Sequence, residues 1–183
     1  MSAEDIRIYG DPVLRKKALP VEAFDDDLRT LVEDMFELMF EADGIGLAAL
    51  QINVSRAFLI IGMPRENQEA ERLFYANPEI LETRGESAFE EGCLSVPDIR
   101  EEVIRPEWIR LRYQDIKGQE QELETDGLLA RVLQHEIDHL NGILFVDRVS
   151  AARKSLLKNS LKKLAREGST GLKVGAEESA MLL

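Results

Sequence analysis

The sequence predicts one domain with helices toward both ends of the chain and strands between them. Apolar side chains repeat at three- and four-residue spacing over residues 25–43, which is typical of an amphipathic helix, and helical signals return after residue 126. Between these regions, apolar runs and turn signals indicate strands. No repeat and no domain-sized linker divides the 183 residues, so we expect a single domain over 1–167 and a flexible tail over 168–183.

Two helices are predicted before the strands. The helix at 25–43 begins with the aspartates 25–27, which supply an N-cap and negative charge in the first turn, and it ends before Gly44. A shorter helix is predicted at 12–18, because Pro12 suits a first helical position after Asp11. The apolar stripe of the longer helix consists of Leu28, Leu31, Val32, Met35, Leu38, Met39 and Ala42.

The strands are predicted from apolar or alternating runs that polar and turn-forming residues bound. The first run ends at Gly62, and the polar residues 63–72 after it are expected to form a loop. A second run leads into Asn77-Pro78, which is a turn signal. The predicted strands are 57–61, 73–76, 108–113 and 119–123.

Two helices are predicted after the strands. The first covers residues 126–140 and ends at Asn141-Gly142, and the second covers 150–166 with Ser150 as its cap. The second helix carries several basic side chains and no acidic one. Its basic residues are Arg153, Lys154, Lys158, Lys162, Lys163 and Arg166.

Composition restricts the class of protein. Lys and Arg number 23 against 35 Asp and Glu, and the resulting net charge of −12 argues against a general nucleic-acid binder. The single cysteine excludes an intrachain disulfide and is typical of a reducing compartment. The first five residues lack the regions of a signal peptide, and the apolar stretch 57–63 is too short to span a bilayer. We therefore expect a soluble cytoplasmic protein with no membrane partner.

The strongest chemical signal is the segment 135–139, His-Glu-Ile-Asp-His. Residues four apart lie on one face of a helix, so His135 and His139 can reach the same metal ion. Glu136 beside them can take a proton from water bound to that ion. Both histidines of the chain fall in this motif, which favours a metal site over the alternative that they are ordinary core or surface histidines.

The histidine pair needs a further ligand. No histidine follows the motif, so a downstream ligand would have to be Asp147 or Glu167. Upstream, Cys93 follows a glycine in an apparent turn, and a thiolate is a good ligand for a first-row transition metal. A free cysteine is often only a small buried side chain, but the incomplete histidine pair favours Cys93 as the third ligand.

The segment 44–51, Gly-Ile-Gly-Leu-Ala-Ala-Leu-Gln, combines two glycines with small residues. No Lys-Ser/Thr pair follows, so phosphate binding is not indicated. The glycines permit close approach of a neighbouring strand or of an extended ligand. From this segment alone, a helix end with a tight strand entry fits equally well, and Gln51 is either a surface amide or an oxyanion donor.

Taken together, three segments resemble the peptide deformylase family. The family pattern is G-x-G-L-A-A-x-Q, E-G-C-L-S and Q-H-E-x-D-H-L, and residues 44–51, 91–95 and 134–140 match every motif position in this order. Weaker likeness extends the resemblance to about residues 6–165. It implies an α+β fold with mostly antiparallel sheets around a central metal-binding helix, followed by a C-terminal helix. That fold agrees with the elements predicted above.

The resemblance also implies a metal site and its base. Cys93, His135 and His139 would bind one divalent metal ion, and water would hold the open fourth position. Family members typically work with Fe(II), while Ni, Co and Zn can occupy the site. Glu136 would be the general acid and base.

By the same likeness, the reaction is removal of the N-formyl group from the N-terminal formylmethionine of nascent polypeptides, with release of formate. Gln51 and the backbone N–H of Leu94 would stabilise the oxyanion. In this family the C-terminal helix is associated with ribosome docking, so the basic helix 150–166 is a candidate ribosome contact.

The resemblance places the substrate as well. The backbone of Ile45 and Gly46 would pair with the extended peptide. An apolar pocket for the methionine side chain would involve Ile45, Leu129 and Leu133. Arg131 interrupts this apolar stretch, and we expect it near the pocket rim.

Two other functions fit part of the pattern. A metallopeptidase of broader specificity would use the same H-E-x-x-H chemistry, but Cys93 and the segment 44–51 argue against it. A binding module with a purely structural site would need a fourth protein ligand, which an acidic residue would have to supply.

Overall fold

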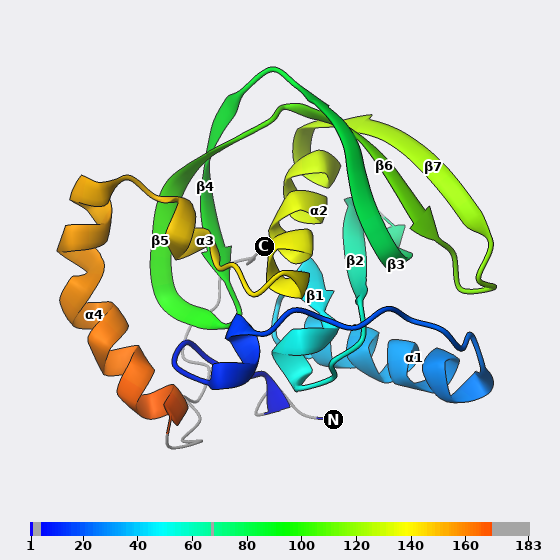
Figure 1. Ribbon diagram of the computed structural model, residues 1–183, viewed down its shortest axis with the longest axis horizontal. Helices are drawn as coiled ribbons and strands as arrows, with labels where there is room; N and C mark the ends of the chain where they lie inside the picture. The colour runs from blue at the N-terminus through cyan, green and yellow to red at the C-terminus, as the bar shows by residue number, and fades with distance from the viewer. Residues whose placement is uncertain (2–4, 67, 170–183) are drawn as a thin grey trace.

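The computed structural model describes residues 1, 5–66 and 68–169 and shows an α+β fold (Figure 1). A five-stranded sheet lies on one side of the helix α2, and a separate two-stranded hairpin lies on its other side. The α+β fold class, the mostly antiparallel sheets, the central helix and the C-terminal helix are confirmed. None of the described helices is long and apolar enough to cross a membrane.

The larger sheet has the order β1-β2-β3-β6-β7, and each neighbouring pair is antiparallel. Its strands are β1 (Gly46–Ala48), β2 (Phe58–Arg65), β3 (Gln68–Arg84), β6 (Trp108–Gln114) and β7 (Glu120–Asp126). The hairpin consists of β4 (Ser87–Cys93) and β5 (Val96–Arg105).

Helices α1 (Asp26–Glu41) and α2 (Gly127–Leu140) pack on opposite faces of the five-stranded sheet. Two further α-helices are α3 (Phe145–Arg148) and α4 (Ala151–Ser169). There are also two short 3₁₀ segments: η2 (Pro12–Arg15) precedes α1, and η3 (Ala49–Ile52) follows β1.

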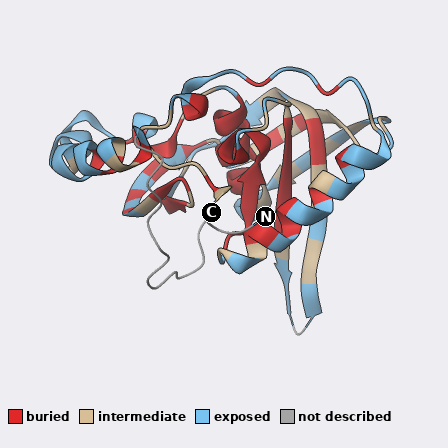
Figure 2. Ribbon diagram, turned by 90° about the horizontal axis from the view of Figure 1, so that it is seen from below, coloured by how far each residue is buried: buried red, intermediate tan, exposed pale blue. Residues whose placement is uncertain are grey.

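Strand β2 is apolar at successive positions because it is buried on both faces. Leu59 and Ile61 pack in the cluster that contains α2. Phe58 and Ile60 point to the other face and pack in the cluster that contains α1. Successive side chains of a strand alternate between faces, so a continuous apolar run indicates a strand covered on both sides. Figure 2 shows the buried residues concentrated in α2 and the strands that face it, whereas α4 is mostly exposed.

The four predicted strands lie within or nearly coincide with β2, β3, β6 and β7, but β2 and β3 are longer than predicted. Residues 63–72, expected to be a loop, belong instead to a long hairpin, because β2 continues to Arg65 and β3 begins at Gln68. The turn expected at Asn77-Pro78 is a register shift inside β3, where Asn77 takes a left-handed φ of 50°. Its amide bonds to both backbone groups of Val21 and to Gln114, which holds the irregular strand in place. A polar run can therefore be an exposed hairpin rather than a loop.

The helix predictions hold at their N-termini. The Asp25 side chain accepts a hydrogen bond from the N–H of Leu28, as an N-cap does. Ser150 accepts one from the N–H of Arg153 and caps α4. The first predicted helix, 12–18, is only the 3₁₀ turn η2, which Asp11 caps. Helix α4 extends to Ser169, three residues beyond the predicted end at 166.

The C-terminal part of α4 packs closely on the N-terminal segment. A Cβ atom at Gly10 would collide with the backbone of Ala165, and one at Gly168 would collide with the carbonyl of Tyr9. These glycines allow the two backbones to approach. The boundary of the domain near 167 stays a prediction, and residues 170–183 of the predicted tail lie outside the described part of the chain.

Candidate metal centre

Three side chains from two elements converge at the centre of the protein. Cys93 ends β4, and His135 and His139 lie one turn apart on α2. The Sγ of Cys93 lies 3.2 Å from Nε2 of His139, which lies 3.3 Å from Nε2 of His135. All three side chains are buried, and they form the one candidate metal-binding group found among the described residues.

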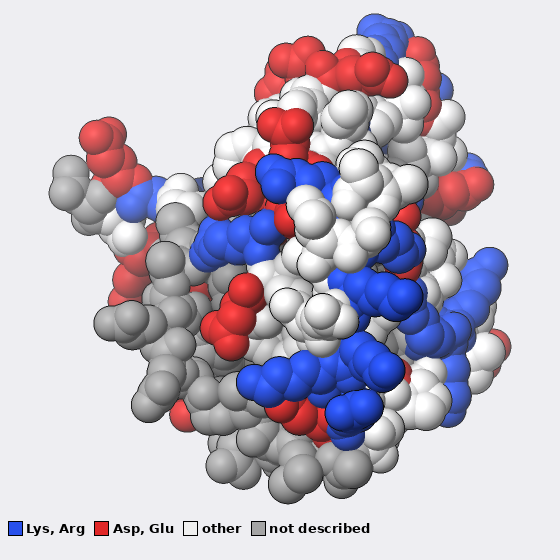
Figure 3. Space-filling model, turned by 90° about the vertical axis from the view of Figure 1, so that its left-hand side faces the viewer, with Lys and Arg blue, Asp and Glu red and all other residues white. Residues whose placement is uncertain are grey.

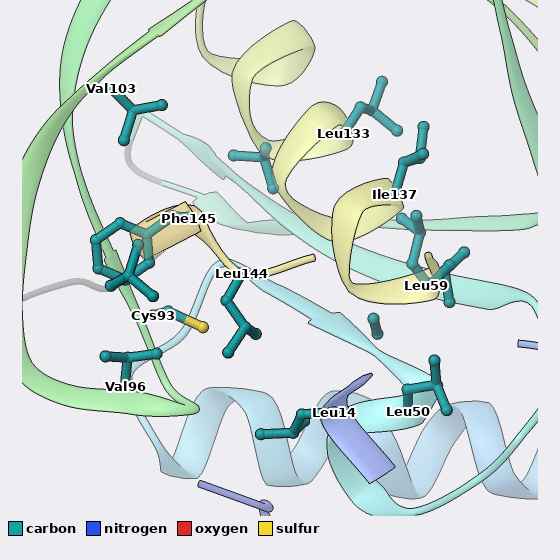
Figure 4. Close-up of a cluster of buried hydrophobic side chains, with 14 of the residues drawn as sticks. Leu14, Leu50, Leu59, Cys93, Val96, Val103, Leu133, Ile137, Leu144 and Phe145 are labelled. Atoms are coloured by element: carbon teal, nitrogen blue, oxygen red, sulfur yellow. The ribbon is translucent and has the colours of Figure 1, made fainter. Parts of the chain in front are cut away.

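These separations fit a metal ion. Zinc-like ions bind thiolate sulfur at about 2.3 Å and imidazole nitrogen at about 2.0–2.1 Å, so tetrahedral ligand atoms lie about 3.3–3.6 Å apart. The 3.3 Å between the two Nε2 atoms matches that geometry, and the 3.2 Å from Sγ to Nε2 of His139 is slightly shorter than it. The donor set of one thiolate and two imidazoles suits a first-row transition metal. Figure 4 shows Cys93 inside an apolar cluster with Val96, Leu144 and Phe145.

Protonation of the histidines follows from their surroundings. Burial and the neighbouring His135 lower the pKa of His139 well below its usual range, so this imidazole is neutral, as a ligand must be. Burial alone would lower the pKa of His135 too, but hydrogen bonds with Cys93 and Glu91 outweigh it and raise that pKa to about 10. Metal binding therefore has to displace a proton here.

A carboxylate behind the metal centre fixes the ring of His135. Nδ1 of His135 lies 2.9 Å from Oε2 of Glu91, which leaves Nε2 facing Cys93 and His139. Such a contact sets the tautomer and the orientation of a metal-binding imidazole. Burial on its own raises the pKa of Glu91, but hydrogen bonds from Arg105 and His135 outweigh it and hold that pKa well below the usual range.

The Glu91 carboxylate belongs to a buried network of charges. Arg105 donates to both of its oxygens, at 2.6 and 2.9 Å, and also to Asp138 at 2.6 Å. Asp138 in turn accepts hydrogen bonds from Arg148 of α3. Arg131 donates to Glu91 as well, at 3.0 Å. Arg131 is therefore buried in this network, because its guanidinium binds carboxylate and carbonyl acceptors inside the protein. The expectation that Arg131 lies near a pocket rim is wrong.

Glu136 is the one carboxylate beside the metal centre with unused oxygens. It is fully buried, and neither oxygen has a hydrogen-bond partner among the described residues. Burial raises the pKa of Glu136 to about 7, in part offset by the charges of His135 and Arg105. A carboxylate with a pKa near neutrality can both accept and donate a proton at physiological pH.

The 3₁₀ segment η3 places the amide of Gln51 beside the thiolate. Gln51 Oε1 accepts a hydrogen bond from the N–H of Ala48 at 2.7 Å, so the Gln51 NH₂ group faces the other way. Its Nε2 donates to Oγ of Ser95 at 3.1 Å and lies 3.7 Å from Sγ of Cys93. Leu94, between Cys93 and Ser95, is partly buried and lies against Gly44.

Of the residues expected to bind substrate, the structure places some at an opening and others in the core. A cavity of about 290 Å³ is lined by Phe40, Asp43, Gly44, Ile45, Gly62, Pro64 and Ala70. Ile45 is in this set, whereas Leu129 and Leu133 are not. Leu133 is completely buried in the apolar cluster, against which the partly buried Leu129 packs. The α2 side chains that approach Gly46 are those of Val132 and Glu136.

The alternative downstream ligands lie elsewhere. Asp147 pairs with Arg15 and Lys154, and it caps α3. Glu167 lies 4.0 Å from Lys163 on the exposed α4. The residues that sequence reasoning missed are Glu91 and Arg105 as supports of the metal centre. For Glu91, its position two residues before the cysteine was an available signal. Nothing in the local sequence marked Arg105.

A buried Cys-His-His group with a free carboxylate next to the first histidine defines a metal-dependent hydrolase. The family model for polypeptide deformylase matches residues 3–155. A peptide deformylase from Acidobacterium capsulatum is 46% identical over 160 residues, covering 87% of this chain and 94% of the relative. The chain belongs to the peptide deformylase family.

Solved structures agree with this assignment. A peptide deformylase from Legionella pneumophila has 45% sequence identity and a TM-score of 0.80, covering 88% of this chain and 94% of its own. A peptide deformylase 1B from Arabidopsis thaliana has 36% identity and a TM-score of 0.85, covering 92% and 93% of the two chains. The likeness in fold therefore extends over nearly the whole described chain.

Proposed function

We propose that the protein hydrolyses the N-formyl group of formylmethionine at the start of nascent polypeptides and releases formate. The observation that carries the proposal is the unpartnered Glu136 carboxylate, buried beside a Cys-His-His group. Family membership supports the substrate class. A broader metallopeptidase is less well supported, because the relatives found share the deformylase name over nearly their full length.

The peptide is proposed to bind along β1. Among the described residues, β1 pairs only with β2, so its other edge can accept an extended chain by backbone hydrogen bonds. Gly46 lies against Glu136, so the substrate end nearest Gly46 reaches the metal centre. The strand continues through Ile45 and Gly44 to the cavity described above. Side chains that follow the methionine would lie in that direction.

When bound, a divalent ion supplies a Lewis acid that polarises the formyl carbonyl and makes water a better nucleophile. Cys93, His135 and His139 would hold it. Glu136 takes the proton from the attacking water and delivers it to the departing amine, as its pKa near 7 allows. Gln51 Nε2, oriented by Ala48 and Ser95, donates to the developing oxyanion.

The backbone N–H of Leu94 is proposed as the second donor to the oxyanion. It belongs to the turn between Cys93 and Ser95, so it moves with the thiolate ligand. For the methionine side chain we propose a pocket beside α2, lined by Ile45 and by the face that carries Leu129. Leu133, which is completely buried, is proposed as the wall behind this pocket.

We propose Fe(II) as the ion in the cell, with Ni, Co or Zn able to replace it. A thiolate with two imidazoles accommodates each of them. The iron form should lose activity under air faster than a nickel form, through oxidation of the ion or of Cys93. Metal analysis of protein purified without oxygen, together with activity half-lives of both forms, tests this assignment.

A ribosome contact through α4 is the proposed partner interaction. Figure 3 shows Lys and Arg side chains gathered on the face where α4 lies. Lys158, Lys162 and Lys163 are exposed there, whereas the whole chain carries a net charge of −12. RNA phosphate attracts a basic helix and repels an acidic body, so the protein would approach RNA with the helix facing it. Nascent chains are made in the cytoplasm, which is where we place the protein.

The decisive experiment is formate release from a formyl-methionyl peptide, run beside the same peptide without the formyl group. The proposal expects formate from the first and no cleavage of the second. Cleavage of the unformylated peptide would establish a broader peptidase. Absence of any turnover by metal-loaded protein would favour a binding module with a structural metal site.

A further inference from the structure

Arg131 lies on α2 one turn before His135, and its side chain binds the β4–β5 hairpin. Nη1 donates to Oε1 of Glu91 and to the carbonyl of Val103, both at 3.0 Å. Nη2 donates to the carbonyl and to Oγ of Ser87, both at 2.7 Å. Only 4% of the side chain is exposed, so the hairpin and not water supplies these acceptors.

The two elements that Arg131 joins carry different metal ligands. Cys93 comes from the hairpin, while His135 and His139 come from α2. The distance from Sγ to the two Nε2 atoms therefore depends on how the hairpin sits on the helix. We propose that Arg131 is a positioning residue that clamps the hairpin onto α2 and so sets the thiolate of Cys93 against the histidine pair.

The hairpin is attached to α2 before, at and after His135, and Glu91 makes the contact with His135 itself. Arg105 of β5 binds Asp138, three residues after His135. Arg131, four residues before His135, provides an attachment one turn earlier on the helix. Without Arg131, the hydrogen bonds of Glu91 and Arg105 would hold the hairpin only at His135 and Asp138. The earlier attachment fixes the tilt of the hairpin as well as its distance.

Glu91 transmits the position of the hairpin to His135. Its Oε1 accepts from Arg105 and Arg131, and its Oε2 accepts from Arg105 and from Nδ1 of His135. A carboxylate has about four acceptor sites, so this set is complete. Loss of Arg131 would leave the buried Oε1 short of a donor and would free the carbonyls of Val103 and Ser87. Unsatisfied buried acceptors are costly, so the hairpin would shift to find others.

The test uses protein loaded with Co(II), whose visible absorption reports thiolate and imidazole coordination. Arg131→Met removes all four hydrogen bonds at similar length. We expect cobalt release to a chelator to become about 10- to 100-fold faster, as for other groups that support metal ligands, and the thiolate-to-cobalt band to shift. Arg131→Lys keeps the charge but cannot span Glu91 and Ser87 together, so its release rate should be intermediate.

Arg112→Met is the matched control. The side chain of Arg112 on β6 is 41% exposed and donates a hydrogen bond to Glu79, away from the metal centre, so release rate and spectrum should equal those of the wild type. A wild-type spectrum and release rate in Arg131→Met would overturn the proposal, even if its unfolding midpoint fell. If Arg131→Met does not fold, Arg131→Lys decides by the same two readouts. Metal release is measured without substrate, so this outcome is separate from that of the proposed function.

Discussion

Gly46 of β1 lies against Glu136 of α2 so closely that no side chain fits between them. A Cβ atom at Gly46 would collide with Oε1 of Glu136, and it would lie 2.9 Å from Cγ1 of Val132 and 3.0 Å from Cδ of Glu136. Because Gly46 has no side chain, the Glu136 carboxylate can lie directly against β1. The strand proposed to bind the peptide and the base proposed to move the proton are in direct contact.

Gly46→Ala should displace Glu136 and lower turnover by about 100-fold, because small misplacements of a reacting group cost about that much. Metal content should not change, since the three atoms nearest to the added Cβ belong to Glu136 and Val132 and not to a proposed ligand. Gly127→Ala is the control: it strains a left-handed backbone of φ 57° but meets no atom within 4 Å. That variant should lose stability and keep its turnover per bound metal. A wild-type kcat in Gly46→Ala would show that close approach of Gly46 is not needed to position Glu136.

Glu136→Gln separates catalysis from metal binding. The amide is nearly isosteric with the carboxylate but cannot accept the proton, so turnover should fall by about 10²–10⁴-fold. Metal content, measured by elemental analysis, should equal that of the wild type. Turnover like that of the wild type would remove Glu136 from the mechanism.

Stability should depend on pH through the same residue. Burial raises the pKa of Glu136 from 4.5 to about 7. Between these values the unfolded chain has released a proton that the folded protein still holds, so the free energy of unfolding falls as pH rises through this window. In metal-free protein, Glu136→Gln should be more stable than the wild type by up to about 3 kcal/mol at about pH 8. The difference should shrink toward about pH 5 in urea titrations; a constant difference would be inconsistent with burial of the charge.

Each proposed ligand should be necessary for metal retention. Cys93→Ala, His135→Ala and His139→Ala should each lose metal and turnover together, because two ligands hold a divalent ion poorly. Metal content after dialysis against a weak chelator and formate release measure the two effects. Full metal content and activity in Cys93→Ala would show that the thiolate is not a ligand.

Charge reversal on α4 should weaken ribosome binding and leave deformylation of a short peptide unchanged. Lys158, Lys162 and Lys163 changed to Glu would turn an attractive face into a repulsive one. Co-sedimentation of the wild type with ribosomes should also fall steeply as salt is added, as for any contact with RNA phosphate. Reversal of Arg110 and Arg112 on the exposed sheet is the control. Salt-independent binding, or normal sedimentation of the α4 variant, would leave this helix as an ordinary solvated face.

Local patterns predicted much of the fold because they act over a few residues. The Asp25 cap, the apolar run of β2 and the i, i+4 histidines follow from short-range geometry. The outer part of the β2–β3 hairpin was expected to be a loop, because residues 63–72 are polar and show no strand pattern; their pairing continues the register that begins at Phe58 and Ala76. The Asn77-Pro78 pair predicts a turn for a similar reason: the contacts of Asn77 with Val21 and Gln114, which hold it inside a strand, come from distant parts of the chain.

The sequence by itself determined which side chains can do the chemistry: a thiol, two imidazoles and a carboxylate in motifs of fixed spacing. Only the tertiary structure decided how Cys93 meets the histidines, because the two motifs lie on different elements more than 40 positions apart. It also decided that Arg131 points into the protein, since its acceptors come from β4 and β5. Motifs specify ligand chemistry through local geometry, whereas burial and long-range hydrogen bonds set the charge and orientation of each group.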